Sequence, residues 1–445
     1  QVGAEEAMTA DQVVWSEQGR LHLSYKGHIA DGAQQTGNSN AEGGTFEIDT
    51  DIDGNAVATG SVDHGVRVND MVLVADSNAT VRGLVTSVDN DQISIALYDA
   101  GNNTATFANA GLATGSGDSA TLLVYGSEFA KGTGYNALNA ATVVESRTAN
   151  EPQFKSFSNK PIIMKDYYEV SGSDASRIGW VEVSSENGQS GYLWYLKAES
   201  DTRARFTDYV EMAMLESVKG DASQSLADSF LGVTGDTYGT QGLFAAIEDR
   251  GNITTGVTGV NAATDLAEFD AILAEFDKQG AIEENMLFVN RATSLAMDDM
   301  LASMNSYGAG GTSYGVFDNS EDMALNLGFS GFRRGSYDFY KSDFRYLNDK
   351  ATRGGINDRA GSAAIRGVII PAGVSSVYDQ ALGKNLKRPF LHVRYRASQT
   401  DDRRMKTWVT GSVGATTSAL DAMQVHYLSE RCLVTQAANN FMLMK

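Results

Sequence analysis

The chain has 445 residues, and its 56 acidic and 35 basic side chains give a formal net charge of −21 at pH 7. So acidic a surface repels phosphate backbones and anionic membranes, which disfavours direct nucleic-acid binding by the whole chain. The length allows two or three domains, and 46 glycines with only four prolines indicate a turn-rich β protein.

Residues 1–45 are polar and irregular, which indicates an N-terminal arm. We expect a short helix over Met8–Val14 and apolar anchors such as Trp15 that dock on another surface. Because the chain starts at Gln1 and not at Met, we also expect that its first residues have been trimmed or removed by a protease.

Residues 46–129 change to period-two alternation of apolar and polar side chains. Short strands about 8–12 residues apart, separated by polar turns, are typical of a small β-barrel or sandwich. The expected strands are Thr45–Asp49, Val66–Val74, Gly83–Asp91, Gln92–Leu97 and Thr121–Gly126.

A long polar arm with Pro152 and Pro161 follows the β module, and a helical pattern then begins. Apolar side chains recur at helical spacing from Phe206 to Met214, which predicts a helix over residues 200–219. Ser200 or Thr202 is the expected N-cap, and Gly220 is expected to end the helix.

Residues 220–370 alternate between helical and strand patterns, which indicates a sheet flanked by helices. The expected helices are Asp221–Leu231, Gly242–Asp249, Thr264–Gln279 and Arg291–Met304, the last capped by Asn290. The expected strands are Met286–Val289, Phe339–Leu347 and Ile365–Ile370. The end of the chain returns to long antiparallel strands over Phe390–Arg396, Lys406–Gly411 and Gln424–Val434.

Residue patterns typical of catalysis or cofactor binding are weak throughout. The only cysteine, Cys432, lies in an apolar run, which favours a buried inert thiol over a reactive one. The five histidines are scattered (His22 and His28 in the arm), Gly308–Thr312 lacks the lysine of a phosphate loop, and the pairs Asp298–Asp299 and Asp401–Asp402 favour solvated charge. We therefore predict no enzyme activity, no cofactor and no metal site.

One motif leaves an alternative open. Asp49, Asp51 and Asp53 with Gly54 match the start of a calcium-binding loop, but the position where such a loop carries glutamate is Gly60. A β-hairpin turn is the favoured interpretation, and ion binding is the alternative.

A basic cluster stands out against the acidic background. It consists of Lys384, Lys387, Arg388, Arg394, Arg396, Arg403, Arg404 and Lys406, with Asp401 and Asp402 in the same window. Such density favours a surface complementary to an acidic neighbour, such as another copy of this chain. A solvated strand face is the alternative.

The order of these segments resembles the major capsid proteins of tailed bacteriophages with the HK97 fold, of the large-phage (myovirus) type. The resemblance extends from about residue 10 to the end of the chain. It rests on Tyr125–Gly132, on Asn159–Ile163 with Val170–Gly172, on the helix 200–219, and on Glu430–Thr435 with Asn439–Phe441.

The resemblance implies an α+β fold with a defined plan. Residues 1–45 would be an N-arm, 46–160 an extended E-loop with the β module inserted, and 161–220 a P-domain with its spine helix. Residues 221–375 would be an α/β A-domain, and 376–445 would return to the P-domain sheet. A prohead protease would account for the trimmed N-terminus.

The resemblance also implies a function and partners. Copies of the chain would assemble as hexamers and pentamers into an icosahedral shell in the host bacterial cytoplasm, and the shell would become part of the virion. It would enclose double-stranded DNA without binding it specifically, and would meet minor capsid, decoration and portal proteins. Inter-subunit contacts are expected at Trp15, Phe154, Phe157, Lys384, Lys387, Arg388, Arg394, Arg396, Arg403 and Arg404.

Two other classes of protein remain open from the sequence. A secreted or surface-layer binding protein would also be acidic, glycine-rich and poor in cysteine. A polysaccharide-active hydrolase with an accessory β module would need carboxylates that converge in a cleft.

Overall fold

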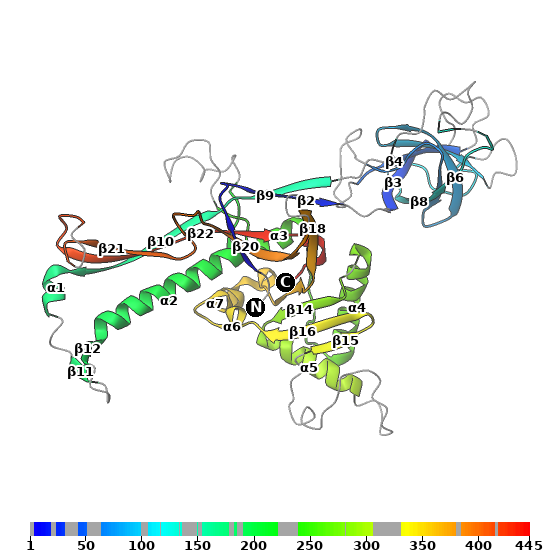
Figure 1. Ribbon diagram of the computed structural model, residues 1–445. Helices are drawn as coiled ribbons and strands as arrows, with labels where there is room; N and C mark the ends of the chain where they lie inside the picture. Colours follow the sequence, from blue (N-terminus) through cyan, green and yellow to red (C-terminus); the bar gives the residue numbers. More distant parts are fainter. Residues whose placement is uncertain are drawn as a thin grey trace. The chain divides into compact units, whose positions relative to one another are not determined.

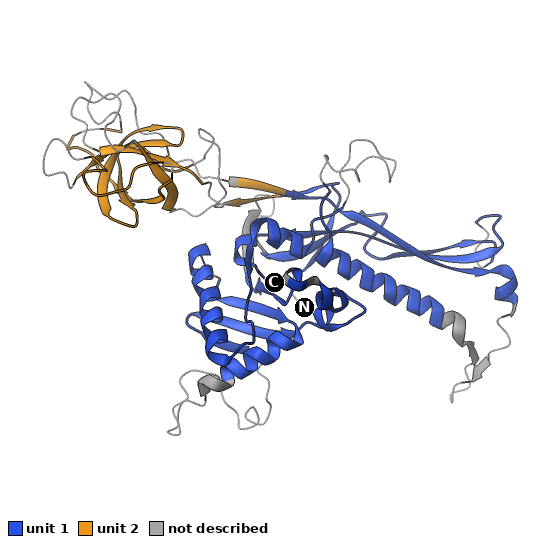
Figure 2. Ribbon diagram, turned by 180° about the vertical axis from the view of Figure 1, so that it is seen from behind, with its two compact units in different colours: residues 1–14, 158–445 blue, residues 15–157 orange. Residues whose placement is uncertain are grey.

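The computed structural model describes residues 4–18, 24–31, 43–50, 64–98, 106–115, 117–132, 134–135, 149, 154–177, 182–184, 190–220, 239–280, 282–305, 331–379, 384–413 and 417–445. The chain divides into two compact units, drawn in two colours in Figure 2. One unit is Trp15–Phe157, and the other combines Gln1–Val14 with Ser158–Lys445. The smaller unit is thus inserted into the larger one.

The smaller unit contains a closed barrel of antiparallel strands in the order β3, β4, β7, β6, β5, β8 (Figure 1). The strands are β3 (Ser24–Asp31), β4 (Gly43–Ile48), β5 (Asp70–Ala75), β6 (Thr80–Asp89), β7 (Gln92–Leu97) and β8 (Ala120–Ser127). The inward members of the alternating pattern, such as Phe46, Val72 and Ile95, are completely buried in one core. The predicted barrel or sandwich is therefore a barrel.

The barrel begins earlier in the chain than the alternation predicted. Strand β3 lies within residues 1–45, where we expected an arm, and it closes the barrel between β4 and β8. Gly27 interrupts the apolar series of β3, which hid the strand in the sequence. A Cβ atom at this position would lie 1.9 Å from the backbone oxygen of Glu47, so the close approach of the two strands requires glycine.

Two paired strands flank the barrel in the sequence. Strand β2 (Val13–Gln18) precedes it, and strand β9 (Phe154–Asn159) follows it, and the two form a small sheet. The helix expected over Met8–Val14 is wrong, because these residues lie in β1 (Glu5–Met8), a turn and the start of β2.

A five-stranded sheet forms one half of the larger unit. Its strands are β1, β20 (Leu391–Arg396), β22 (Ala422–Thr435) and β10 (Ile162–Ser171) in that order, and β21 (Lys406–Gly411) also pairs with β22. The expected antiparallel strands at the end of the chain are confirmed. The long strand β22 is central, because β10 pairs along one side and β21 and β20 pair in succession along the other.

Helix α2 (Leu193–Glu216) runs along one face of this sheet (Figure 1). Its buried residues Phe206 and Val210 pack against Val425 and Tyr427 of β22, as the helical stripe predicted. At 24 residues, the helix is about 36 Å long.

The predicted ends of this helix are wrong. Ser200 and Thr202 lie inside it, and their hydroxyls donate to the backbone oxygens of Lys197 and Ala198 in the preceding turn. The segment Leu193–Glu199 contains good helix formers and no breaker, so the helix extends through it.

A six-stranded mixed sheet forms the other half of the larger unit. Its order is β13 (Asn252–Thr254), β23 (Met442–Met444), β17 (Gly367–Pro371), β14 (Glu284–Val289), β16 (Tyr337–Asp343) and β15 (Gly331–Arg334). Leu287 and Val289 face a core with helices α4 (Ala262–Gln279) and α5 (Arg291–Asn305). Phe288 faces a second core with α3 (Leu243–Arg250) and α6 (Arg345–Asn348). Both faces are covered, which explains the continuous apolar run of β14.

The helix signals in this half are confirmed where the structure describes them. Asn290 caps α5 by accepting from Thr293 N at 2.8 Å, and Asn261 caps α4 in the same way. The strand expected over Phe339–Leu347 is too long, because β16 ends at Asp343 and α6 follows. Strand β23 joins this sheet, although we expected the end of the chain to return to the other one.

The remaining elements are α1 (Gly172–Arg177), β11 (Glu182–Ser184), β12 (Ser190–Tyr192), α7 (Arg353–Ala360), β18 (Val374–Asp379), β19 (Lys384–Pro389) and the 3₁₀ helices Gly361–Ala363 and Ala438–Asn440. The expected helix Asp221–Leu231 and loop 306–312 lie outside the described residues. None of the helices in the described ranges is long and apolar enough to cross a lipid bilayer.

Candidate assembly surface

The N-terminal segment, residues 4–11, lies along the edge of the five-stranded sheet. Strand β1 pairs with β20 in parallel, with Glu6 opposite Arg394 and Met8 opposite Arg396. Val393 N donates to Ala4 O at 2.9 Å, and Ala397 N donates to Met8 O at 3.1 Å, so both ends of the strand are held. The side chain of Met8 is buried. This part of the expected arm is therefore an integral edge strand.

Two neighbouring carboxylates of β1 are bound by arginines on opposite faces of the sheet. Glu6 lies 3.1 Å from both Arg388 and Arg394. Glu5 lies 3.1 Å from Arg404 and 3.3 Å from Arg431. Successive strand residues point to opposite faces of a sheet. The ion pairs of Glu5 therefore hold the strand on one face, and those of Glu6 hold it on the other.

The guanidinium groups are crowded at this edge. Burial lowers the pKa of Arg394, and the nearby charge of Arg388 lowers it further. Arginine stays charged even so, because its ordinary pKa is far above neutral, and the carboxylate of Glu6 compensates part of the desolvation and repulsion. The contact therefore depends on the charge of the N-terminal strand.

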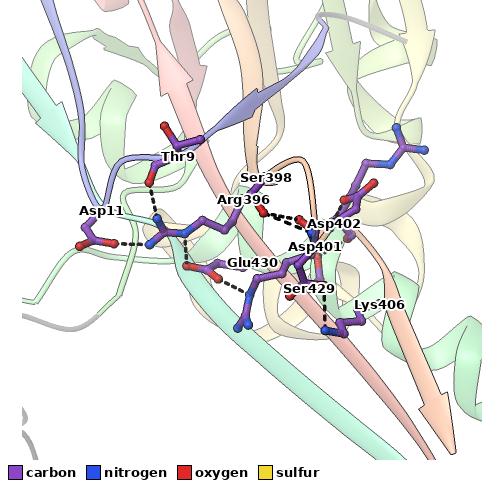
Figure 3. Close-up of polar contacts among 11 residues, drawn as sticks. Thr9, Asp11, Arg396, Ser398, Asp401, Asp402, Lys406, Ser429 and Glu430 are labelled. Atoms are coloured by element: carbon purple, nitrogen blue, oxygen red, sulfur yellow. Dashed lines mark hydrogen bonds and ion pairs between the residues drawn. The ribbon is translucent and has the colours of Figure 1, made fainter.

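Arg396 connects the N-terminal segment to the centre of the sheet (Figure 3). It donates to Thr9 O at 2.6 Å, pairs with the carboxylate of Asp11, and donates to Glu430 at 3.2 Å. The hydrogen bond to Asp11, followed by the one to Glu430, raises the pKa of Arg396. Arg403 pairs with the other oxygen of Glu430 at 2.6 Å. The side chain of Glu430 is only 6% exposed, so one nearly buried carboxylate is shared by two guanidinium groups.

The loop between β20 and β21 is shaped by its own polar groups, as Figure 3 shows. Lys406 pairs with Asp401 at 2.7 Å, and Arg404 N donates to Asp402 at 2.9 Å. The hydroxyl of Ser429 donates to the backbone oxygen of Arg404 at 2.8 Å. The adjacent carboxylates therefore hold the turn and do not face each other as a catalytic pair.

The arginines of the predicted basic cluster are paired within the chain, and their contact with a second copy stays a prediction. Arg388, Arg394, Arg396, Arg403 and Arg404 all pair with carboxylates of this same chain, mainly in the N-terminal segment. The side chains of Lys384 and Lys387 lie outside the described residues. Sequence reasoning missed Glu5, Glu6, Asp11 and Glu430. The only signal was the acidic pair at residues 5 and 6, which no local pattern connects to residues 388–404.

The predicted aromatic contacts lie on the two strands that flank the barrel. Trp15 of β2 packs against Phe157 of β9, with ring centroids 6.3 Å apart, and only 9% of Trp15 is exposed. The side chain of Phe154 lies outside the described residues. Trp15 and Phe157 thus contact each other within the chain, and their contact with a second copy stays a prediction.

Asn159 anchors the point where the chain re-enters the larger unit. Its amide nitrogen donates to Gln241 O at 3.0 Å and Leu433 O at 2.7 Å. Its amide oxygen accepts from Gln241 N at 2.8 Å, from Lys160 N at 2.9 Å and from Thr240 Oγ1 at 3.2 Å. The residue is buried, and one side chain therefore joins β9, β22 and the segment that precedes α3.

The face of the five-stranded sheet away from α2 carries an aromatic stack. His426 of β22 lies between Tyr167 of β10 and Trp408 of β21, with ring centroids 5.9 Å and 5.1 Å away. Tyr167 is 55% exposed, and Ile163 on the same strand face is 53% exposed. Large apolar side chains of this kind on a sheet face are typical of contact surfaces.

A cavity of about 780 Å³ lies beside the N-terminal segment within the larger unit. Ala4 and Glu5 form part of its wall, together with apolar side chains that include Met214, Phe288 and Leu433. His392 also lines it, and burial lowers the pKa of this imidazole. The N-terminal segment therefore covers part of the interior of this unit.

Three reactive or charged residues that the sequence analysis considered lie in structural positions. Cys432 is completely buried, and burial raises the pKa of its thiol to about 12, as expected for an inert cysteine. Asp298 is not a solvated charge, because only 12% of its side chain is exposed and it pairs with the nearly buried Lys341. His28 was expected in a loose arm but lies in β3, where it is 9% exposed.

No protein-family model and no curated protein matches the chain. Among solved structures, it is similar to a chain of Microbacterium phage Oxtober96, with 9% identity, a TM-score of 0.35, and coverage of 70% of this chain and 81% of the other. It is also similar to the mature capsid of bacteriophage PhiM1, with 8% identity, a TM-score of 0.33, and coverage of 69% of this chain and 78% of the other. A third similar structure is the capsid of cyanophage P-SCSP1u, with 8% identity, a TM-score of 0.35, and coverage of 72% of this chain and 80% of the other. Because these TM-scores are low, the function is inferred from the architecture of the chain itself.

Proposed function

We propose that the chain is a capsid shell subunit of a bacteriophage, which acts by assembling with copies of itself. The observation that carries the proposal is the order of the elements along the chain. A 24-residue helix lies along a long sheet, a separate helix-flanked sheet follows, and a barrel is inserted between two paired strands. This plan supports the P-domain, A-domain and E-loop that the sequence resemblance implies.

The distribution of exposed apolar groups supports assembly and not catalysis. Ile163 and Tyr167 are more than half exposed on the sheet face away from α2, beside the stack with His426. Burial of apolar area of this kind against another copy would contribute about 25 cal/mol per Å² before the costs of association. Repeated at every subunit of a shell, a modest contact of this kind gives a stable particle.

We further propose which parts of neighbouring copies make contact. The β2–β9 pair and the inserted barrel would extend over a neighbouring subunit, and hexamers and pentamers would close into an icosahedral shell around double-stranded DNA. Minor capsid, decoration and portal proteins would be further partners. The large-phage type remains a prediction from the sequence.

Expression of the full chain and negative-stain electron microscopy test the proposal. We expect capsomers or closed shells in concentrated fractions from gel filtration, and light scattering that rises steeply above a threshold concentration. A chain that stays monomeric at every concentration and ionic strength contradicts the proposal. Hydrolysis of a panel of polysaccharides by the monomer would favour the alternative of an enzyme.

A further inference from the structure

Three metal-ligating side chains meet at two neighbouring strands of the barrel, one on β3, one on β4 and one on the residue that follows β4. His28 of β3 is the register partner of Glu47 of β4, and Asp49 follows two residues after Glu47. Residues opposite each other, and residues two apart on one strand, share a sheet face. The barrel architecture therefore brings one imidazole and two carboxylates to the same face.

The donor atoms of these side chains lie close together. One ligand atom from each of His28, Glu47 and Asp49 can be chosen so that all lie within 4.8 Å of one another. The Nδ1 atom of His28 is already 2.8 Å and 2.9 Å from the two oxygens of Asp49. Around a zinc ion with bonds of about 2.1 Å, tetrahedral ligand atoms lie about 3.4 Å apart, so small side-chain rotations suffice.

The surroundings of the three side chains also fit a metal site. Only 11% of the His28 side chain is exposed, whereas Asp49 is 44% exposed, so the group has one inner ligand and an open side. Gln92 Nε2 donates to Glu47 Oε2 at 3.3 Å, which orients that carboxylate. Outer hydrogen bonds of this kind are a regular part of metal sites.

We propose that His28, Glu47 and Asp49 bind a divalent transition-metal ion, with Zn²⁺ as the best match, and that water completes the coordination. One imidazole and two carboxylates form a donor set of intermediate softness, which suits Zn²⁺ better than Ca²⁺. The bound ion would tie β3 to β4 and stabilise the barrel. An ion pair between His28 and Asp49 alone is the competing explanation.

Calorimetric titration of the chelator-treated full chain with ZnCl₂ tests the site, with CaCl₂ as the comparison ion. We expect one saturable Zn²⁺ site, much weaker binding of Ca²⁺, and a rise in the melting temperature of the barrel with Zn²⁺. His28→Asn and Asp49→Asn are each expected to weaken binding at least about 100-fold, and Gln92→Ala about tenfold. His64→Asn is the matched control, because His64 is also a histidine of the smaller unit and its ring forms a hydrogen bond with the backbone oxygen of Asn90.

Two results would overturn the site. One is the absence of saturable Zn²⁺ binding by the folded wild-type chain. The other is wild-type affinity in both His28→Asn and Asp49→Asn. Circular dichroism in chelator identifies any variant that does not fold, and Glu47→Gln then replaces it in the comparison. The measurement uses the unassembled chain, so its result does not depend on the proposed shell.

Discussion

The barrel and the five-stranded sheet of this chain bury their apolar residues in different ways. Each barrel strand pairs with a neighbour on both sides, and one side-chain core lies inside. The five-stranded sheet instead has α2 on one face, Tyr167 and Ile163 exposed on the other, and a short charged strand at its edge. The barrel can thus be stable by itself, whereas the sheet retains surfaces that another copy could cover.

This difference predicts that the two units can be destabilised separately. Cys432 provides a reporter, since it is the only cysteine in the sequence and lies buried in β22 of the larger unit. Its thiol pKa of about 12 keeps it protonated and unreactive near neutral pH until the unit opens. Thiol-labelling rates therefore report on the larger unit and not on the barrel.

The largest effect on stability is expected for Phe46→Ala. Phe46 is completely buried in the barrel core, so its truncation leaves a cavity and should lower the free energy of unfolding of the barrel by about 3–5 kcal/mol. Urea unfolding followed by circular dichroism should show an earlier barrel transition, while the labelling rate of Cys432 stays as in the wild type. Faster labelling in this variant would show that the two units unfold together.

Asn159→Ala should have the opposite pattern. The substitution leaves the backbone groups of Gln241 and Leu433 without their buried partner, which should destabilise the larger unit by about 3 kcal/mol. We expect faster labelling of Cys432 and an unchanged barrel transition. Phe46→Ala is the matched control, and equal labelling rates in both variants would contradict the assigned role of Asn159.

The sequence predicted the barrel and the central helices because their signals are local. Alternating apolar residues gave β4 to β8, and Asn290 followed by an apolar stripe gave α5. Strand β3 was missed because close strand packing requires Gly27, which breaks the alternation. The start of α2 was missed because Ser200 and Thr202 resemble caps, although their hydroxyls bond to the preceding turn.

The candidate surface was harder to predict because its partners are distant in the sequence. The density of arginines between residues 388 and 404 predicted a surface complementary to an acidic neighbour, and the structure pairs these arginines with carboxylates of the same chain. Glu5 and Glu6 reach these arginines because β1 pairs in parallel with β20. This pairing joins residues that are almost 400 positions apart in the sequence. A pattern confined to one segment contains no information about such a contact.

Glu430→Gln should have an intermediate effect. The substitution removes the charge that Arg396 and Arg403 share, in a site where the carboxylate is 6% exposed. We expect the free energy of unfolding to fall by about 2 kcal/mol. The decrease is smaller than for a fully buried ion pair, because both guanidinium groups are partly exposed. Thermal unfolding measures the loss. Wild-type stability would show that the two arginines find other partners.

Glu6→Gln should have a smaller effect that depends on salt. The ion pairs of Glu6 with Arg388 and Arg394 are partly exposed, so we expect a loss of about 1 kcal/mol at low ionic strength. In 1 M salt the screening length is about 3 Å, and the difference from the wild type should shrink. Limited proteolysis should cut the N-terminal segment faster in the variant at low salt. A difference that persists in 1 M salt would indicate a packing role instead.

Tyr167→Ser should have the smallest effect on the isolated subunit and a large effect on assembly. Tyr167 is 55% exposed, so its removal should change the free energy of unfolding by less than about 0.5 kcal/mol. In a contact between copies, however, a buried tyrosine contributes about 2 kcal/mol or more. The threshold concentration for assembly, measured by light scattering, should then rise more than tenfold.

Tyr125→Ser is the control for this variant, because Tyr125 is similarly exposed, at 49%, but lies on barrel strand β8. We expect it to assemble at the wild-type threshold. If Tyr167→Ser also did so, the exposed face of the five-stranded sheet would not be a contact between copies. If both variants failed to assemble, Tyr125 would lie in the contact that we propose between the barrel and a neighbouring subunit, and assembly would depend on the exposed side chains of the barrel as much as on those of the sheet.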